Sequence, residues 1–353
     1  MDVKNLKLDL ETLFVLDNFF KNQFRGSYRY GSMGFFYWKL VKNSSFPGII
    51  NGVFINSKLT STASITPKTL LLHNKELFTA EIGDTYVAKR FSGRGFFLKL
   101  VNSSKTYCIK NNINFIYGTP NNQSFPGYVK YCGFEKSEII RPYSFSYLLN
   151  VKNHLKSKLG SFFANLFNIL FRLFLRIHHL VLLLFNNFSS DYYVEEISFF
   201  SSDFDIFFNK LSRDWDFIFS RSSRHMNWRF IENPENYKIF LVKKKEEIVG
   251  YFVYRIILSQ AIAKLVVADF LVSNNHMSAL DFIFHRLRNV AFKNNLTVIN
   301  IWCDINSLFV PSLHKNGLIF KKKIPFINFK NHFTNSLNSI KKIHFTISDT
   351  DNV

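Results

Sequence analysis

Hydrophobic positions follow two different spacings along the first 150 residues. The ranges 48–55 (GIINGVFI), 78–90 (FTAEIGDTYVAKR) and 113–120 (INFIYGTP) have the composition and alternation of strands. Residues 96–112 (FFLKLVNSSKTYCIKNN) have helical spacing, and 124–134 (SFPGYVKYCGF) is typical of a short helix and a turn. Strands that alternate with helices predict a mixed sheet of the α/β (α+β) class.

The same order of elements recurs after residue 190, as a hairpin, a strand, a helix, a strand and a closing helix at 238–256, 261–272, 278–295, 297–303 and 307–320. YWKLVKN at 37–43 matches NWRFIEN at 227–233, and Asp84 in IGDTYV matches Asp269 in VADFLV. The interval from Asp84 to Gly133 is 49 residues and that from Asp269 to Gly317 is 48. We therefore predict two tandem domains of one fold, at 1–150 and 191–353.

The segment between them, 151–190, is apolar apart from one regular series of polar positions. These polar residues are spaced three or four apart, as on one face of a helix: His154, Lys158, Ser161, Asn165, Asn168, Arg172, Arg176 and His179. Arg172 and Arg176 leave only 177–190 uncharged, too short a stretch to span a bilayer. Residues 154–188 are either a peripheral membrane anchor or a linker helix buried between the domains; we favour the linker, because the two domains must be connected.

Composition restricts the other classes of function. The net charge of +20 favours a phosphate-bearing partner, but the lysines and arginines are scattered and the high Phe, Asn, Lys and Ile content is typical of an AT-rich genome. We therefore predict no nucleic-acid partner. The three cysteines lack Cys-x-x-Cys spacing, which argues against disulfides and metal sites. The N-terminus lacks signal-peptide features, so we expect a cytoplasmic protein, with contact at the inner membrane face left open.

The candidate chemistry begins at residues 89–100, KRFSGRGFFLKL, between a predicted strand and a predicted helix. Helix N-termini present unpaired N–H groups, and glycines at 93 and 95 remove the Cβ atoms that block the approach of an anion. The spacing is neither a Walker A loop nor a complete dinucleotide fingerprint. The second domain has SNNHMSA instead, without the arginine or the glycines. Residues 89–95 are thus either a phosphate-binding turn or a plain loop.

Arg90-x-x-Gly93-x-Gly95 in this context resembles the coenzyme A pyrophosphate loop of the GCN5-related N-acetyltransferase (GNAT) superfamily. YVKYCGF at 128–134, preceded by PNNQS, is similar to that family's closing element. Further segments resemble a tandem-GNAT branch associated with bacterial surface polysaccharide loci: FFYWKLVKN, EIGDTYVAKRFSGRGFF, FIYGTPNNQSF, NWRFIENP and IHFTISDTDN. The resemblance implies acetyl-CoA or another acyl-CoA as the cofactor.

It also implies the residues that hold the cofactor. The strand that precedes the loop would pair with the pantetheine arm, amides of the loop would hold the pyrophosphate, arginines would add charge, and an asparagine would line the far side. The corresponding positions are Val87, Ala88, Arg90, Phe91, Ser92, Gly93, Arg94, Gly95, Phe96 and Asn121 or Asn122.

The mechanism that the resemblance implies is direct attack of an amine on the thioester, which requires a general base. Glu81 and Asp84 are the best-placed acids; being three apart on one strand they are expected to point to opposite faces, so only one would face the cleft. We favour Glu81 as the base and a structural role for Asp84. At the position where this family usually has a tyrosine that acts as the general acid, the chain has Val129. Tyr128 is therefore the candidate acid.

The leading hypothesis is an acyl-CoA-dependent N-acyltransferase, most simply an acetyltransferase. Its acceptor would be an amino sugar or another envelope precursor, in a cleft that the second domain helps to shape. Two alternatives stay open. One is a transferase resembling the Fem family, which uses aminoacyl-tRNA; the other is a non-catalytic coenzyme A-binding or membrane-surface scaffold.

Overall fold

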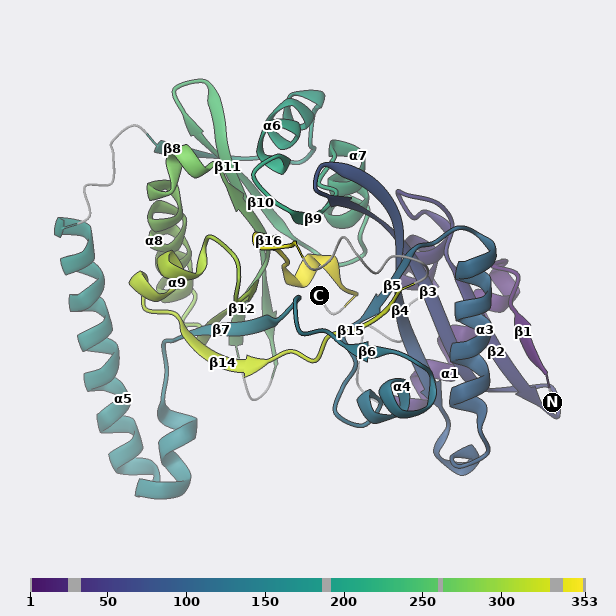
Figure 1. The fold of residues 1–353 in the computed structure, drawn as a ribbon. Helices are drawn as coiled ribbons and strands as arrows, with labels where there is room; N and C mark the ends of the chain where they lie inside the picture. Colours follow the sequence, from purple (N-terminus) through teal and green to yellow (C-terminus); the bar gives the residue numbers. More distant parts are fainter. Residues whose placement is uncertain (1, 25–32, 186–191, 260–262, 331–338, 352–353) are drawn as a thin grey trace.

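The computed structural model describes residues 2–24, 33–185, 192–259, 263–330 and 339–351. Two mixed β-sheets lie side by side, each with helices packed on it (Figure 1). This arrangement confirms the predicted α/β class with two mixed-sheet halves. We call the nine-stranded sheet with its helices the first half and the seven-stranded sheet with its helices the second half.

The first half has the strand order β1-β2-β3-β4-β5-β15-β6; in addition, β9 pairs with β3, and β16 pairs with β9. Its strands are β1 Val3–Asn5, β2 Ile49–Ile55, β3 Lys58–Leu72, β4 Lys75–Val87, β5 Phe115–Gly118, β6 Glu135–Lys136, β9 Phe217–Phe219, β15 Ile327–Lys330 and β16 Ile343–His344. Helix α3 (Phe96–Lys110) packs on β2, β3 and β4, whereas α1 (Leu10–Gln23) contacts β3 and α4 (Phe125–Tyr131) contacts β6 and β15.

The second half has the order β14-β7-β13-β12-β11-β10-β8. Its strands are β7 Pro142–Leu148, β8 Tyr192–Glu196, β10 Lys238–Lys244, β11 Glu247–Leu258, β12 Ala263–Val272, β13 Val298–Asp304 and β14 Ile319–Lys323. Helix α8 (Ser278–Lys293) packs on β11, β12 and β13, and α6 (Ser202–Ser212) packs on β11. The short helix α9 (Val310–Lys315) precedes β14.

The two sheets exchange strands across the boundary predicted at residue 150. β7 lies in the second sheet, between β13 and β14, although it precedes the boundary. β9, β15 and β16 follow the boundary and lie in the first sheet. β7 and β15 pair with β13 and β5, whereas β9 pairs with the end of the central strand β3 and carries β16 on its other side. The halves are therefore interlocked through backbone hydrogen bonds.

The matched tryptophan motifs meet where the two halves join. Each occupies the same pair of elements: a turn of α-helix (α2 Met33–Phe36; α7 Ser223–Met226) that continues into a π-helical turn at Tyr37–Val41 or Asn227–Ile231. The rings of Trp38 and Trp228 stack with centroids 4.9 Å apart. Each indole N–H donates to the other tryptophan's carbonyl, at 2.6 and 3.0 Å. The sequence repeat is therefore a structural repeat, joined by a nearly symmetric contact.

Helix α5 (Lys152–Phe185, interrupted at Gly160) lies at the edge of the molecule beside α8, away from the first sheet (Figure 1). Of its described side chains, only Ala164, Asn168, Leu175 and His179 are buried. The expectation of a linker helix buried between the halves is therefore wrong. Of the predicted polar stripe, Arg172 and His179 contact α8 and the turn after it, whereas Lys158, Ser161, Asn165 and Arg176 are exposed and the side chain of His154 lies outside the described residues. Most of the large apolar side chains of the helix remain exposed.

Candidate functional site

A wedge-shaped opening lies between β4 and β5 at the centre of the first half. The two parallel strands pair only at Thr79–Glu81 with Phe115–Tyr117. β4 then continues to Val87 without β5 beside it, and a cavity of about 1040 Å³ occupies the opening. The second half contributes Trp302 and Lys322 to its wall. The cavity is therefore formed jointly by the two halves.

A β-bulge places Glu81 and Asp84 on the same side of β4. Between β3 and β4 the register shifts: Ser64 pairs with Gly83, whereas Thr62 pairs with Tyr86. Asp84 takes a left-handed conformation, with φ 45°, and both acids line the cavity. The prediction that only one of them faces the cleft is wrong, because the extra residue in the bulge cancels the alternation of the strand.

The glycine loop presents free backbone amides to the cavity. Gly93 and Gly95 have φ values of 79° and 75°, and a Cβ atom at either position would meet nothing within 4 Å. The two glycines therefore supply a backbone conformation and leave the approach open. Gly95 is the N-cap of α3, and the amides of residues 93–98 have no acceptor among the described residues. A set of free donors at a helix N-terminus is suited to binding an anion.

The other predicted cofactor residues fall into two groups. Val87, Phe91, Ser92, Phe96 and Asn121 line the cavity, whereas Ala88, Arg90, Arg94 and Asn122 do not. The amides of Phe91 and Ser92 already donate to the carbonyls of Ala88 and Lys89. Ala88 is buried and its own N–H donates to Thr60, so neither of its backbone groups is free for a ligand.

The remaining members of that prediction lie at the rim or nearby. Arg90 and Arg94 are exposed, and both guanidinium groups lie over the ring of Phe91, at 4.7 and 5.3 Å from its centroid. Asn121 accepts from the amides of Gln123 and Ser124 and so organises the start of α4. Asn122 lines the adjoining cavity instead.

Five charged side chains converge at the floor of the cavity. Lys39 Nζ lies 2.6 Å from Asp84 Oδ2 and 2.5 Å from Asp351 Oδ2. Lys68 Nζ lies 3.5 Å from Asp351 Oδ1 and 3.9 Å from Glu81 Oε2. The five come from four parts of the chain: the first π-helical turn, β3, β4, which supplies both Glu81 and Asp84, and the C-terminal segment. Lys39, Lys68 and Asp351 were missed by the sequence analysis.

Within this cluster the carboxyl groups differ in proton affinity. Burial, reinforced by repulsion from Asp351, raises the pKa of Glu81 to about 8, and its Oε2 accepts no hydrogen bond. Burial opposes ionisation of Asp351 as well, but Lys39 and Lys68 outweigh it and hold the pKa of Asp351 well below its usual range. Burial lowers the pKa of Lys68. Glu81 is thus the carboxyl that exchanges a proton near neutral pH.

Tyr128 lines the same cavity from α4. Its hydroxyl donates to Thr85 Oγ1 on β4 at 2.6 Å, and burial raises the pKa of Tyr128 well above its usual value. The phenol therefore keeps its proton at neutral pH. Val129, at the position where the resemblance implies a tyrosine, packs against the hydrophobic core.

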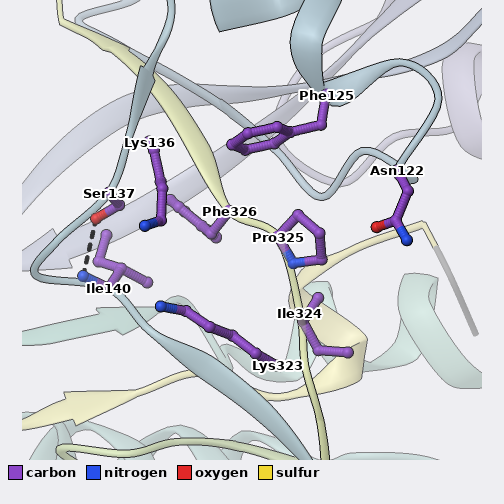
Figure 2. A pocket seen from close by; sticks show the side chains of 9 residues that line it. All are labelled: Asn122, Phe125, Lys136, Ser137, Ile140, Lys323, Ile324, Pro325 and Phe326. Atoms are coloured by element: carbon purple, nitrogen blue, oxygen red, sulfur yellow. Dashed lines mark hydrogen bonds between the residues drawn. The ribbon is translucent and has the colours of Figure 1, made fainter.

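A second cavity, of about 430 Å³, adjoins the first at Ile324 and Pro325, which line both (Figure 2). Phe125, Ile140 and Phe326 supply most of its apolar wall. Its charged lining residues within the described chain are two lysines, Lys136 and Lys323, and no acid lines it. Lys136 Nζ lies 3.4 Å from Glu138 Oε1, which partly compensates its charge, so the positive charge of this largely apolar cavity comes mainly from Lys323.

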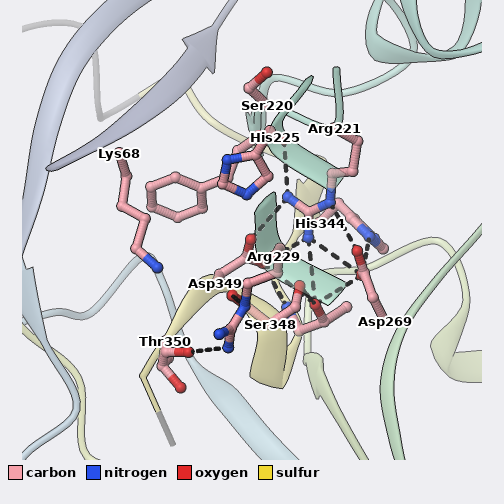
Figure 3. A network of polar contacts seen from close by, with 12 residues as sticks. Lys68, Ser220, Arg221, His225, Arg229, Asp269, His344, Ser348, Asp349 and Thr350 are labelled. Atoms are coloured by element: carbon pink, nitrogen blue, oxygen red, sulfur yellow. Dashed lines mark hydrogen bonds and ion pairs between the residues drawn. The ribbon is translucent and has the colours of Figure 1, made fainter. Parts of the chain in front are cut away.

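The corresponding cleft of the second half is filled by the protein's own C-terminal segment (Figure 3). The turn Ile347–Asp349 packs against β12 and β13. Arg221 lies 2.7 Å from Asp349 and 3.2 Å from Asp269, and Tyr251 donates to Asp269 at 2.8 Å. Every one of these groups is buried, so within the described chain the C-terminal segment occupies the place that the cavity has in the first half.

The described residues contain no group of three or more His, Cys, Asp or Glu side chains that would hold a metal ion. The adjacent histidines of α5 do not form such a group either: His179 accepts from Arg288 Nε at 3.1 Å and its other ring nitrogen lies 2.9 Å from Asn289 Oδ1.

Comparison with known proteins agrees with this geometry. Residues 17–136 match the model of the acetyltransferase (GNAT) domain family. The search of curated proteins returned no match.

Three solved structures share the fold over almost the whole chain. A GCN5-related N-acetyltransferase from Anabaena variabilis matches with a TM-score of 0.63 at 11% identity, over 92% of this chain and 72% of that one. A probable N-acyltransferase from Enterococcus faecalis matches at 0.61 and 14% identity, over 93% and 72% of the two chains. Saccharomyces cerevisiae N-myristoyltransferase with bound myristoyl-CoA matches at 0.61 and 11%, over 93% and 78%. Residues 17–136 are therefore similar to the acetyltransferase (GNAT) domain family, within a chain that has the fold of two GNAT-like halves.

Proposed function

We propose that the protein is an acyl-CoA-dependent N-acyltransferase with one active site, in the first half. The observation that carries this proposal is the alignment of three features along one cavity: the separation of β4 from β5, the free amides of residues 93–98, and Glu81 at the floor. The amides and the N-terminus of α3 would hold the pyrophosphate of coenzyme A. The pantetheine arm would lie along the unpaired edge of β4 between residues 82 and 87.

The proposed reaction is direct attack of a primary amine on the thioester carbonyl. Glu81 takes a proton from the amine, the new C–N bond forms, and the C–S bond breaks. Tyr128 donates its proton to the departing thiolate. A base with a pKa near 8 suits the first role. Tyr128 is proposed for the second role because this residue lines the same cavity. Lys39 and Asp351 are proposed to keep the cluster charged and Glu81 in place, without contacting the substrate.

The acceptor is proposed to be an amine that also carries negative charge, such as an amino sugar on a nucleotide or lipid carrier. Support for this comes from the adjoining cavity, in which Lys136 and Lys323 face apolar side chains. Acetyl is the simplest acyl group, and the size of the combined cavities is compatible with longer chains.

Isothermal calorimetry tests the cofactor site without knowledge of the acceptor. Acetyl-CoA and myristoyl-CoA are titrated into the wild-type protein and into a variant with Gly93→Val and Gly95→Val. We expect micromolar binding by the wild type and at least a tenfold loss in the variant, because valine resists the left-handed conformation and blocks the amides. The better of the two ligands indicates the acyl length.

A second variant, Gly93→Ala and Gly95→Ala, separates the effect of backbone strain from that of side-chain bulk over the amides. A Cβ atom at either position meets nothing within 4 Å in the protein, so alanine adds little bulk. Circular dichroism and thermal unfolding establish that each variant is folded. A folded wild-type protein that binds neither acyl-CoA would overturn the proposal.

A further inference from the structure

The exposed face of α5 is an extended hydrophobic surface. Twelve large apolar side chains on this helix are exposed, from 40% for Val181 to 72% for Phe162: Leu159, Phe162, Phe163, Leu166, Phe167, Ile169, Leu170, Leu173, Phe174, Ile177, Leu180 and Val181. Together they account for nearly half of the exposed large hydrophobic residues of the described chain. A surface of this size on a water-soluble protein marks an interaction site.

The polar residues of α5 are used to attach it to the second half. Arg172 donates to Asn295 at 3.0 Å, and the His179 ring bonds with Asn289 and Arg288. Asn168 accepts from the amide of Val151, the residue before α5, at 2.9 Å and so ties the helix to its own start. The contacts of Arg172 and His179 lie seven residues apart, about two turns of the helix. The orientation with apolar groups outward is therefore fixed by specific bonds.

The charge on α5 identifies the partner. The helix contains five basic residues, Lys152, Lys156, Lys158, Arg172 and Arg176, and no acidic residue. Beyond the break at Gly160, with about 100° between successive residues, Arg172 and Arg176 fall along one margin of the apolar face. A wide Phe- and Leu-rich face with basic residues beside it is the pattern of a helix that lies in the interface of an anionic membrane. The net charge of +20 adds a longer-range attraction to such a surface.

The topology decides between lying on the bilayer and crossing it. By length and composition alone, Lys158–Val181 (24 residues, mean hydropathy 1.3) is long enough to cross a membrane. A single crossing would place the flanking chain on opposite sides of a hydrocarbon layer about 30 Å thick. However, the strands on either side of α5, β7 and β8, belong to one sheet. The helix therefore lies parallel to the membrane plane.

We propose that α5 anchors the protein to the surface of anionic membranes by inserting its exposed apolar face into one leaflet. This inference does not depend on the proposed acyltransferase activity. Its consequence is that the folded body stays at the membrane, where a carrier-linked acceptor would be found.

Vesicle flotation of the full chain tests the anchor. We expect the wild type to bind phosphatidylglycerol-containing vesicles, and more weakly in 0.5 M salt or on pure phosphatidylcholine. The variant Phe162→Glu, Ile169→Glu and Leu173→Glu should lose at least tenfold in binding. The matched control Phe78→Glu, Ile206→Glu and Leu258→Glu changes the charge equally at exposed apolar positions outside α5, and should bind as the wild type does.

Depth measurements test the orientation. A fluorescent label is placed on cysteine at Phe163, Leu170 or Ile177, which are seven residues apart on the outer face; Cys108, Cys132 and Cys303 are buried and do not react. Quenching by brominated lipids should report one shallow depth at all three sites. A label at position 170 that is deeper than both others would show a crossing helix and overturn the proposal.

Two other results would also overturn it. In the first, the wild type does not bind vesicles, sedimentation shows that it is a dimer, and the α5 variant is a monomer. The apolar face of α5 would then bind a second copy of the chain. The other is equal loss of binding in the control variant. Acetyl-CoA calorimetry on the α5 variant is expected to match the wild type, so failure of the anchor and failure of the cofactor site are distinguishable.

Discussion

The two halves share one arrangement of strand, loop and helix, but the space beside the strand is open in the first half and filled in the second. In the first half, β4 leads through a glycine loop into α3, and the gap beside β4 is an open cavity. In the second half, β12 leads through SNNHMSA into α8, and the C-terminal segment fills the gap. Both halves bury charge at this point, Lys39 with Asp84 in one and Arg221 with Asp269 in the other.

The difference lies in how each charge cluster is completed. Arg221 is held by two aspartates and by carbonyl and hydroxyl groups, as a buried guanidinium requires. In the first half, Lys68 Nζ, Glu81 Oε2 and Asp351 Oδ1 have no hydrogen-bond partner. In the second half, Arg221 and both aspartates are hydrogen-bonded, and the atoms of this cluster without a partner in the described chain are the ring nitrogens of His344. In the first half, the atoms without a partner belong to a cluster that lines a cavity. The C-terminal segment contributes a carboxylate to each cluster: Asp349 pairs with Arg221 in the second half, and Asp351 pairs with Lys39 in the first half.

The largest effect is expected from Glu81→Gln. If Glu81 is the base, the rate of coenzyme A release with a suitable amine falls by about 10²- to 10⁴-fold, while affinity for acetyl-CoA is kept. In the wild type the rate should rise with pH through about 8, because the base acts only after losing its proton. The variant should lose this dependence.

The matched control is Glu76→Gln, an exposed position on the same strand. Equal rates in Glu81→Gln and the wild type would assign the base to another group and remove the main functional contrast between the halves.

Arg221→Met is expected to have the largest effect on folding. Removing the guanidinium leaves Asp269 and Asp349 buried without a counter-charge, which costs roughly 3–5 kcal/mol in the free energy of unfolding. Urea denaturation measures this change. Arg213→Met, at an exposed position, should change stability by about 0.5 kcal/mol or less. A decrease of less than about 1 kcal/mol in the free energy of unfolding of Arg221→Met would contradict a structural role for the cluster of Arg221, Asp269 and Asp349.

A smaller effect tests the symmetry of the contact between the halves. Trp38→Phe and Trp228→Phe each remove one indole N–H and leave one buried carbonyl without its donor, a cost of roughly 1–3 kcal/mol. Because the two bonds are reciprocal, we expect similar losses of stability, and less than their sum in the double variant. A large effect at one tryptophan only would show that the contact is not symmetric.

The sequence predicted the elements with clear periodicity, including β4, α3, β12 and α8, and it predicted the repeat. It missed β3, because Lys58–Leu72 is rich in Ser, Thr and Lys and contains a proline, which is not the composition of a buried strand. That strand is nevertheless almost entirely buried, since Ser64, Thr66 and Lys68 face the internal charge cluster.

Two features of the site depended on tertiary structure that local patterns do not encode. The bulge at Asp84 changes which side chains of β4 face the cavity, and no residue type at that point predicts a bulge. Asp351 reaches Lys39 from more than 300 positions away in the chain. For α5, the sequence predicted one continuous polar stripe, but the helix is interrupted at Gly160, and of that stripe Arg172 and His179 bond to α8 and the turn after it. The sequence did not show that most large apolar side chains of α5 stay outside.

The central claim is one acyl-CoA site per chain, in the first half. Native mass spectrometry of the wild type with saturating acetyl-CoA tests it most directly. The account predicts one bound molecule per chain, and none on the folded Gly93→Val, Gly95→Val variant. Two bound molecules per chain, or one that persists in this variant, would contradict it, because the second half would then bind the cofactor in spite of its filled cleft.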